Sequence, residues 1–203
     1  MNSLYASPPT INRPTSLLPT LTMDSFSDFC HHARIVNRMF TMHSTEALSL
    51  PRLLPLLPRA RYNRARPCRI YWRFEDRIPV QLFPKGTVQV LGKLATQESC
   101  EAIRQCLMTK LSITLSQPHL SSCTVTCRLA ARISRLTSLP SNQHVSNDYE
   151  LFPGTLIRPS KSPNQHAHLC FFSNGHVIVT GVTSLRQAYR HVKRCLHEHD
   201  LKY

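Results

Sequence analysis

Two stretches of the chain repeat the same order of apolar and polar positions. Each begins with an apolar run, 80–83 or 169–172, and continues into a tight turn that ends at Gly86 or Gly175. A turn of this size with glycine at its end joins antiparallel strands. After the turn, valines alternate with other residues, which is the period of a strand with one buried face. The pattern therefore predicts two β-hairpins.

A helix is predicted after each hairpin, because apolar residues recur there at helical spacing. The two stripes consist of Ala102, Ile103, Cys106 and Leu107 in the first copy and of Tyr189, Val192, Cys195 and Leu196 in the second. The opposite face of the second helix is basic, with Arg186, Arg190, Lys193 and Arg194. Such a face fits either a solvated surface or a binding surface.

The two copies lie at one constant offset. Gly86 and Gly175 are 89 residues apart, as are Phe83 and Phe172. Seven such matches fall within 25 positions, which indicates an internal duplication. The other matched pairs are Gly92 with Gly181, Val88 with Val177, Val90 with Val179, Cys106 with Cys195 and Leu107 with Leu196.

Further strands are predicted upstream of the hairpins, over Ile35–Met42, Cys68–Phe74 and Ser122–Arg128. Each half is then a sheet with helices on one face. Two fused halves imply a long curved sheet whose other face is bare, and a large bare face indicates a ligand.

Charge narrows the class of ligand. The chain has 25 Lys and Arg residues against 11 Asp and Glu, a formal net charge of +14, which attracts polyanions. We expect no membrane helix, because no long uninterrupted apolar span is present, and no secretory signal at the N-terminus. Residues 1–28, rich in Ser, Thr and Pro, are predicted to form a flexible tail.

Catalytic and metal-binding patterns do not stand out in the sequence. We find no Ser-His-Asp, paired-carboxylate or phosphate-loop arrangement, and we expect no enzyme activity, cofactor or small-molecule substrate. The eight cysteines lack the spacing of a zinc ribbon, so we expect reduced thiols and no metal site. A generic RNA binder would carry aromatic stacking platforms, and aromatics make up only 7% of the chain.

Four segments resemble the TATA-box-binding protein family. The stretch 149–158 (YELFPGTLIR) is similar to the family's E-L-F-P-G-L-I-Y-R, and 172–181 to its F-x-S-G-K-x-V-x-T-G hairpin. Residues 61–64 resemble E-Y-N-P, and 35–37 the opening strand with its central Asn. The resemblance implies an α+β saddle: two pseudo-symmetric repeats, 29–112 and 113–203, form a curved antiparallel sheet with helices on the convex face.

The resemblance also implies minor-groove binding to double-stranded, AT-rich DNA. Members of the family insert two Phe wedges per repeat between base steps and bend the duplex. Here the wedges fall on Phe152 and Phe172 in the second repeat and on Phe83 in the first. The fourth falls on Pro67, or on Arg66 if the gap is moved, so that wedge is lost or altered.

Further contacts carry over by position. The central Asn is Asn37, and its second-repeat counterpart is Ser121 or Ser122. Gln89 replaces a usual Val, which makes the first half of the saddle more polar. The groove-facing positions are Met39, Thr41, Gln89, Leu91, Ile178 and Thr180, and the phosphate-contacting positions are Arg66, Arg73 and Arg158.

Protein partners are implied as well. The family's acidic turn, here Asp148, Glu150 and Leu151, contacts transcription factor IIB. Prolines across Leu48–Arg59 predict that the first helix of repeat one is shortened. The resemblance implies an initiation factor in the nucleus that recruits transcription factor IIB. The alternative is a paralogue with weak TATA affinity that serves other promoters or sequesters partners.

Overall fold

The computed structural model describes residues 25–65, 67–129, 133, 145–146, 153–158 and 167–199. Its strands form one ten-stranded sheet in the order β2-β3-β4-β5-β1-β6-β10-β9-β8-β7, and every pairing is antiparallel. The strands are β1 (Arg34–His43), β2 (Arg61–Asn63), β3 (Arg69–Phe74), β4 (Ile78–Leu82), β5 (Thr87–Gly92), β6 (His119–Arg128), β7 (Val145–Ser146), β8 (Gly154–Ile157), β9 (His168–Phe172) and β10 (His176–Val182).

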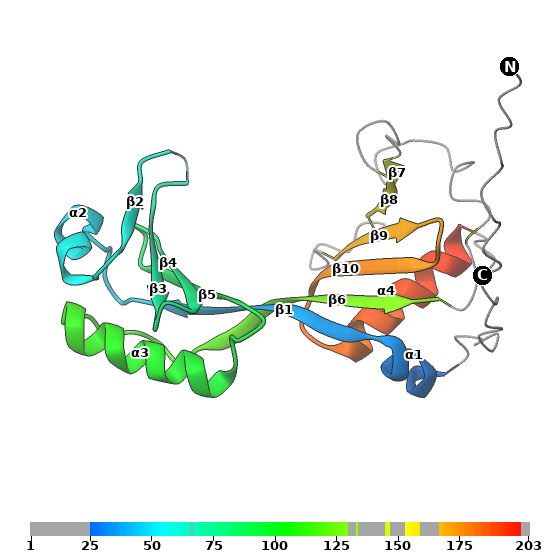
Figure 1. Ribbon diagram of the computed structural model, residues 1–203, viewed down its shortest axis with the longest axis horizontal. Coiled ribbons are helices and arrows are strands. Elements are labelled where there is room, and N and C mark those ends of the chain that lie inside the picture. The colour runs from blue at the N-terminus through cyan, green and yellow to red at the C-terminus, as the bar shows by residue number, and fades with distance from the viewer. Residues whose placement is uncertain are drawn as a thin grey trace, which may run out of the picture.

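The helices lie mainly on one side of this sheet. Figure 1 shows α3 and α4 on the same side, beneath opposite ends of the sheet. The helical segments are α1 (Phe26–His32), α2 (Leu50–Leu53), the short 3-10 segment η1 (Leu54–Leu56), α3 (Gln97–Leu111) and α4 (Leu185–Glu198). In the part of the chain that the structure describes, no helix is both long and apolar enough to cross a membrane. The predicted α+β saddle is confirmed.

The strand order is the same when read outward from the centre in either direction. β1 and β6 pair at the centre, and β5, β4, β3 and β2 follow on one side as β10, β9, β8 and β7 follow on the other. We call the side from β2 to β1 the N-terminal half and the side from β6 to β7 the C-terminal half. Each half carries one long helix, α3 or α4.

The two predicted hairpins have the same turn. The N–H of Gly86 donates to the carbonyl of Phe83 at 3.1 Å, and the N–H of Gly175 donates to the carbonyl of Phe172 at 2.9 Å. Both glycines have positive φ, 86° and 83°, which L side chains rarely adopt. A Cβ at Gly86 would also lie 2.8 Å from the carbonyl oxygen of Glu46. Glycine is therefore required at Gly86.

Each half has its own hydrophobic core between the sheet and its helix. In the N-terminal half, Val88 and Val90 pack with Ile103 and Leu107 of α3. In the C-terminal half, Val177 and Val179 pack in the cluster that includes Val192 and Cys195 of α4. The predicted stripes hold in part: Ala102 is exposed, and Cys100 and Leu111 are buried on α3 instead. The face of α3 that packs on the sheet therefore runs through Cys100, Ile103, Leu107 and Leu111 and does not include Ala102.

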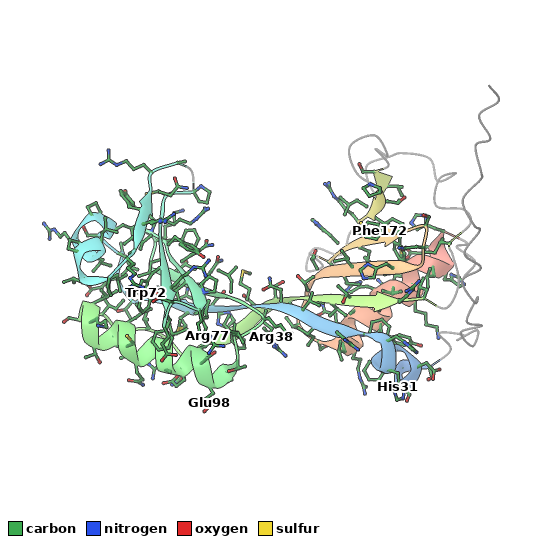
Figure 2. All side chains as sticks on the ribbon, viewed as in Figure 1. His31, Arg38, Trp72, Arg77, Glu98 and Phe172 are labelled. Atoms are coloured by element: carbon green, nitrogen blue, oxygen red, sulfur yellow. The ribbon has the colours of Figure 1, made fainter. Side chains whose placement is uncertain are left out.

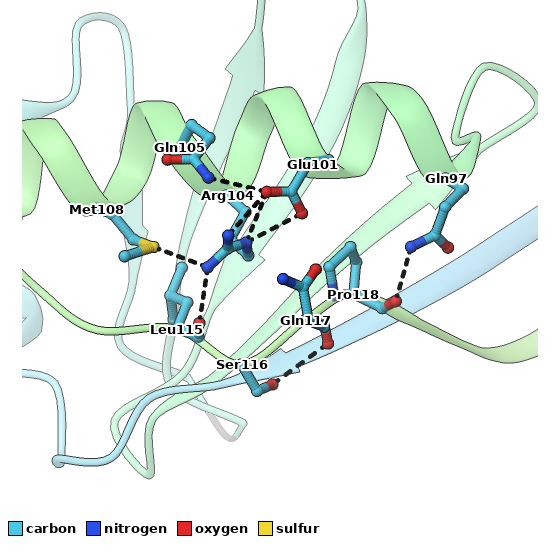
Figure 3. Close-up of polar contacts among 9 residues, drawn as sticks. All are labelled: Gln97, Glu101, Arg104, Gln105, Met108, Leu115, Ser116, Gln117 and Pro118. Carbon is cyan, nitrogen blue, oxygen red and sulfur yellow. Dashed lines mark hydrogen bonds and ion pairs between the residues drawn. The ribbon is translucent and has the colours of Figure 1, made fainter.

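Helix α3 is fixed at its start and along its exposed side. Thr96 caps it, because its hydroxyl accepts from the N–H of Ser99 while Ser99 accepts from the N–H of Thr96. Arg104 forms an ion pair with Glu101 and donates to the carbonyl of Leu115 (Figure 3). The guanidinium thereby lowers the pKa of Glu101 and ties α3 to the segment that leads into β6.

Helix α1 was not predicted. It begins at Phe26, with Ser25 as its N-cap, so residues 26–28 lie in a helix instead of in the tail that we expected. Phe26 and Phe29 each contact the ring of Tyr189 on α4, with centroids 5.7 and 5.5 Å apart. Residues 1–24 lie outside the described residues.

The predicted shortening of the first helix is confirmed. α2 spans only Leu50–Leu53, and η1 continues it for Leu54–Leu56. Pro51 lies in the first turn of α2, where the missing N–H costs nothing, and Pro55 lies in η1, where a longer α-helix would need that N–H.

Candidate nucleic-acid interface

The face of the sheet away from α3 and α4 is defined by the strand registers. Side chains directly opposite one another on paired strands share a face, and neighbours along a strand alternate. Val88 and Val90 are fully buried toward α3, so Gln89 and Leu91 lie on the other side, which we call the open face. The registers extend this assignment across all ten strands, and Figure 2 shows side chains projecting from both sides of the sheet.

A continuous row of side chains crosses the open face of the N-terminal half. The registers pair each member with the next, from β2 through β3, β4, β5 and β1 to β6. The row consists of Arg61, Tyr71, Gln81, Gln89, Thr41 and His119. All six side chains carry a hydrogen-bonding group, so we call this the polar row.

An equivalent row crosses the C-terminal half. Starting from β7, it runs through β8, β9, β10 and β6 to β1. It consists of Ser146, Leu156, Cys170, Ile178, Thr126 and Arg34. Burial raises the pKa of the Cys170 thiol to about 11, so this group is a neutral, weakly polar side chain. The middle of the row is apolar, and we call it the apolar row.

Members of the two rows correspond one to one. Gln81 and Cys170 are 89 residues apart, and so are Gln89 and Ile178. These offsets are the ones that relate the two hairpins. The open face thus presents two glutamine amides in one half where the other half presents a thiol and an isoleucine.

The outer end of the polar row opens into a pocket of about 270 Å³. Its walls are Arg59, Arg61, Tyr71, Arg73 and Asp76. Arg73 stacks on the ring of Tyr71, with the guanidinium carbon 5.9 Å from the centroid, and Arg59 is paired with Asp76. Three guanidiniums against one carboxylate make this pocket, which we call the arginine pocket, suited to an anion such as a phosphate.

Comparison with known proteins identifies the fold and finds a family match for part of the chain. Residues 117–198 match the family described as transcription factor TFIID, or TATA-binding protein (TBP). The TBP of Methanococcus jannaschii has the same fold, with a TM-score of 0.63 and 20% sequence identity, over 82% of this chain and 97% of that chain. The chain therefore has the TBP fold, and its residues 117–198 are similar to the TBP family. No curated protein matches the sequence.

The matched family is described as a transcription factor. This match gives the residues predicted from the resemblance a structural setting. Phe83 and Phe172 occupy the same place in the two hairpins, each at the carbonyl that accepts from the turn glycine. Both are half-buried, and Phe172, labelled in Figure 2, has its ring centroid 5.8 Å from that of His176.

The central polar position of the C-terminal half is Ser122 by register. The pseudo-symmetry that relates the two halves exchanges β1 with β6. Asn37 of β1 pairs with Thr124 of β6, and Met39 of β1 pairs with Ser122 of β6, so the β6 residue equivalent to Asn37 is Ser122. The sequence left Ser121 and Ser122 open. The Ser121 hydroxyl lies 2.8 Å from the Thr41 hydroxyl and donates to the carbonyl of Met39 at 2.9 Å. Thr41 is only 7% exposed, so both hydroxyls are engaged within the sheet.

Other predicted residues divide between the open face and segments that are not described. Met39, Leu91, Ile178 and Thr180 lie half-buried on the open face. Arg73 and Arg158 are exposed, and Pro67 is exposed between β2 and β3. The predictions for Arg66, Phe152, Asp148, Glu150 and Leu151 fall outside the described residues.

Several contributors to the open face were missed from the sequence, among them Arg61, Tyr71 and Gln81. Tyr71 and Gln81 alternate with buried neighbours, since Ile70, Trp72, Val80 and Leu82 face the core. That alternation was visible in the sequence, but the pairing of β2 with β3 was not. The sequence analysis therefore did not predict that Arg61 lies next to Tyr71.

The basic face of α4 lies on the opposite side of the molecule. Arg186 stacks over the ring of Phe26 of α1, and Lys193 over Tyr189, with distances to the ring centroids of 5.3 and 5.8 Å. His191 is buried on the inner face of α4, and its Nδ1 has no partner among the described residues. Burial lowers the pKa of His191, and the nearby Arg194 and Arg190 lower it further.

Proposed function

We propose that the open face binds the minor groove of AT-rich promoter DNA and bends it during the initiation of transcription. The observation that carries this proposal is a sheet face on which the described residues place no helix between two phenylalanines at equivalent hairpin turns, Phe83 and Phe172. Aromatic rings at both ends of such a face are placed to enter between base steps. Unstacking costs a few kcal/mol per step, and the larger contact area of the bent duplex offsets it.

Charge supports the same ligand. The net charge of +14 favours approach to a polyanion, and neutralised phosphates release counterions on binding. Arg73 and Arg158 lie exposed on β3 and just after β8, near the outer ends of the two halves. There they would contact backbone phosphates, while Asn37 and Ser122 near the centre would donate to the acceptors on the groove floor.

A role in initiation also requires protein partners. We propose that 29–112 and 113–203 act as two repeats, and that the turn with Asp148, Glu150 and Leu151 contacts a factor of the transcription factor IIB class. The nucleus is the proposed location. The match of residues 117–198 to the TBP family supports these assignments, and no catalytic step is part of the proposal.

The alternative of a paralogue with altered promoter choice has a specific observation in its favour. The family's first-repeat wedge falls on Pro67 or on Arg66, and Pro67, which is exposed, offers less area than a phenyl ring. The polar row also replaces apolar groove contacts in the N-terminal half. Both changes would lower the affinity for a purely AT-rich site while the saddle fold is kept.

The proposal is tested with duplexes that carry a fluorescent pair on their ends. Energy transfer should rise when the protein bends a TATA-containing duplex and should stay unchanged with a GC-rich duplex of equal length. For Phe83→Ala/Phe172→Ala we expect no bending and an affinity lower by roughly tenfold or more, because nothing then offsets the cost of unstacking.

Leu94→Ala is the matched control. Leu94 is 47% exposed, and its carbonyl accepts from Ser99 of α3, on the side of the sheet away from the open face. This variant should bind and bend DNA like the wild type. Salt-sensitive binding without bending or sequence preference in the wild type would contradict the proposal and favour a partner-binding role.

A further inference from the structure

The two glutamines of the polar row are free to bond to a ligand. Gln81 and Gln89 face each other on β4 and β5, and both side chains are half-buried. Neither side-chain amide bonds to any other of the described residues. Each amide offers an oxygen that accepts hydrogen bonds and an NH₂ group that donates two. Two adjacent amides therefore present both kinds of group at the same point of the open face.

The minor groove distinguishes base pairs by one group. A·T and T·A pairs present only acceptors there, whereas a G·C pair adds the N2 amino donor of guanine. A glutamine can donate to the acceptors of an A·T pair or accept from the guanine amino group. Ile178, Cys170 and Leu156 on the apolar row have no strong acceptor, so a guanine amino group against them would lose its water without gaining a partner.

We infer that the two halves of the open face read different base pairs. The N-terminal half, through Gln81 and Gln89, accepts G·C as well as A·T, whereas the C-terminal half, through Ile178 and its neighbours, requires A·T. The DNA site is then directional: one half-site is AT-only and the other is mixed. This inference rests on the proposed binding of the open face to the minor groove.

Three duplexes of equal length test it with the full-length protein. The first has A·T pairs in both half-sites, the second has one G·C pair in one half-site, and the third has one G·C pair at the matching position in each. The protein can bind the second duplex in either orientation. We therefore expect it to bind within about threefold of the first, and the third to bind about tenfold more weakly, which is the usual scale for one unfavourable base pair.

Exchanging equivalent residues identifies the cause. Gln81→Cys/Gln89→Ile gives the N-terminal half the residues that the C-terminal half has at the equivalent positions, Cys170 and Ile178. Both halves should then require A·T, so the second duplex should bind about tenfold more weakly than the first. Ile178→Gln is the reciprocal variant, and it should restore binding of the third duplex to within a few-fold of the first. Both changes are at half-buried positions, and thermal unfolding of each variant checks that it folds.

The outcomes separate the inference from the proposed function. If the wild type binds the all-A·T duplex but loses tenfold with the second duplex, and the exchanges leave this loss unchanged, the inference is wrong and the proposed function stands. If the wild type does not prefer the all-A·T duplex over a GC-rich duplex, the proposed function fails and the inference fails with it.

Discussion

The N-terminal and C-terminal halves have the same order of strands and different open faces. The six positions of the polar row correspond one to one with those of the apolar row, and the two hairpins turn through the same glycine hydrogen bond. Their cores are also alike, with valines of β5 and β10 packed against helices. The chemistry differs where no core constrains it, at Gln81 and Gln89 against Cys170 and Ile178.

The comparison shows which part of a duplicated fold is open to change. A core residue contacts neighbours on all sides, so a polar replacement there leaves a buried group without a partner. A half-buried residue on the open face, such as Gln89 or Ile178, has fewer protein neighbours, so its chemistry depends more on the ligand. Differences between the halves therefore report on the ligand more directly than the shared core does.

The largest effect is expected from equivalent core truncations. Leu82 and Phe171 are 89 residues apart and both are 0% exposed. Phe171→Ala should lower the free energy of unfolding by about 3–5 kcal/mol and Leu82→Ala by about 2–5 kcal/mol, because each leaves a cavity. Unfolding in urea measures both values.

The same curves test whether the halves unfold together. β1 supplies Phe40 and Met42 to the N-terminal core, and Ala33 just before it packs in the C-terminal core. We expect one cooperative transition for each variant. Two separate transitions would show that the halves are independent folding units.

A moderate effect is expected between pH 7.5 and pH 5.5, from His191 in the C-terminal half. The pKa of His191 lies below its ordinary 6.5 in the folded state, so below pH 6.5 the unfolded chain binds more protons at this site. The contribution of His191 to stability should fall as pH drops from 6.5 toward the folded pKa, by at most about 1.4 kcal/mol per pH unit. Unfolding in urea at pH 7.5 and pH 5.5 measures it.

His191→Gln supplies the comparison for this effect. A neutral side chain of similar size should leave the other histidines unchanged and remove the His191 part of the pH dependence. Identical pH profiles for the variant and the wild type would mean that His191 is protonated equally in both states.

The smallest effect is expected from the ends of the two rows. Arg61→Ser gives the outer end of the polar row the residue type that Ser146 supplies at the outer end of the apolar row. If Arg61 contacts a phosphate, the slope of log affinity against log salt should decrease by about 1, with little change in sequence preference. Titrations of an AT-rich duplex at several salt concentrations measure the slope.

Arg52→Ala is the control for charge alone. Arg52 is exposed on α2 and does not lie in either row. It removes one positive charge, as Arg61→Ser does. Equal salt slopes for the two variants would show that the arginine pocket does not bind a phosphate.

The repeated hairpins were predictable because they are local. Strand, turn and strand lie within about a dozen residues in each copy, and the glycine positions fix the turns. The proline-shortened helix was predictable for the same reason, since Pro55 acts on its own backbone. The α+β saddle then followed from the resemblance in segments such as 149–158 and 172–181.

Features that depend on distant partners were not predictable. The choice between Ser121 and Ser122 depends on register shifts between β1 and β6, at Ile35/Asn37 and Met39/Phe40, which leave no mark in the sequence. The arginine pocket requires β2 to pair with β3 and Asp76 to approach Arg59. Helix α1 is only two turns long, and its partner Tyr189 lies near the other end of the chain.

The contact between α1 and α4 has a consequence for the order of events on the ribosome. Phe26 and Phe29 emerge early, but Tyr189 is synthesised about 160 residues later, which is roughly ten seconds or more at ordinary rates of translation. During that interval the two phenylalanines cannot pack against Tyr189. β1 likewise cannot pair with β6 until β6 has been synthesised. The synthesis of α4 is therefore also the step that allows the C-terminal core to close over the first helix.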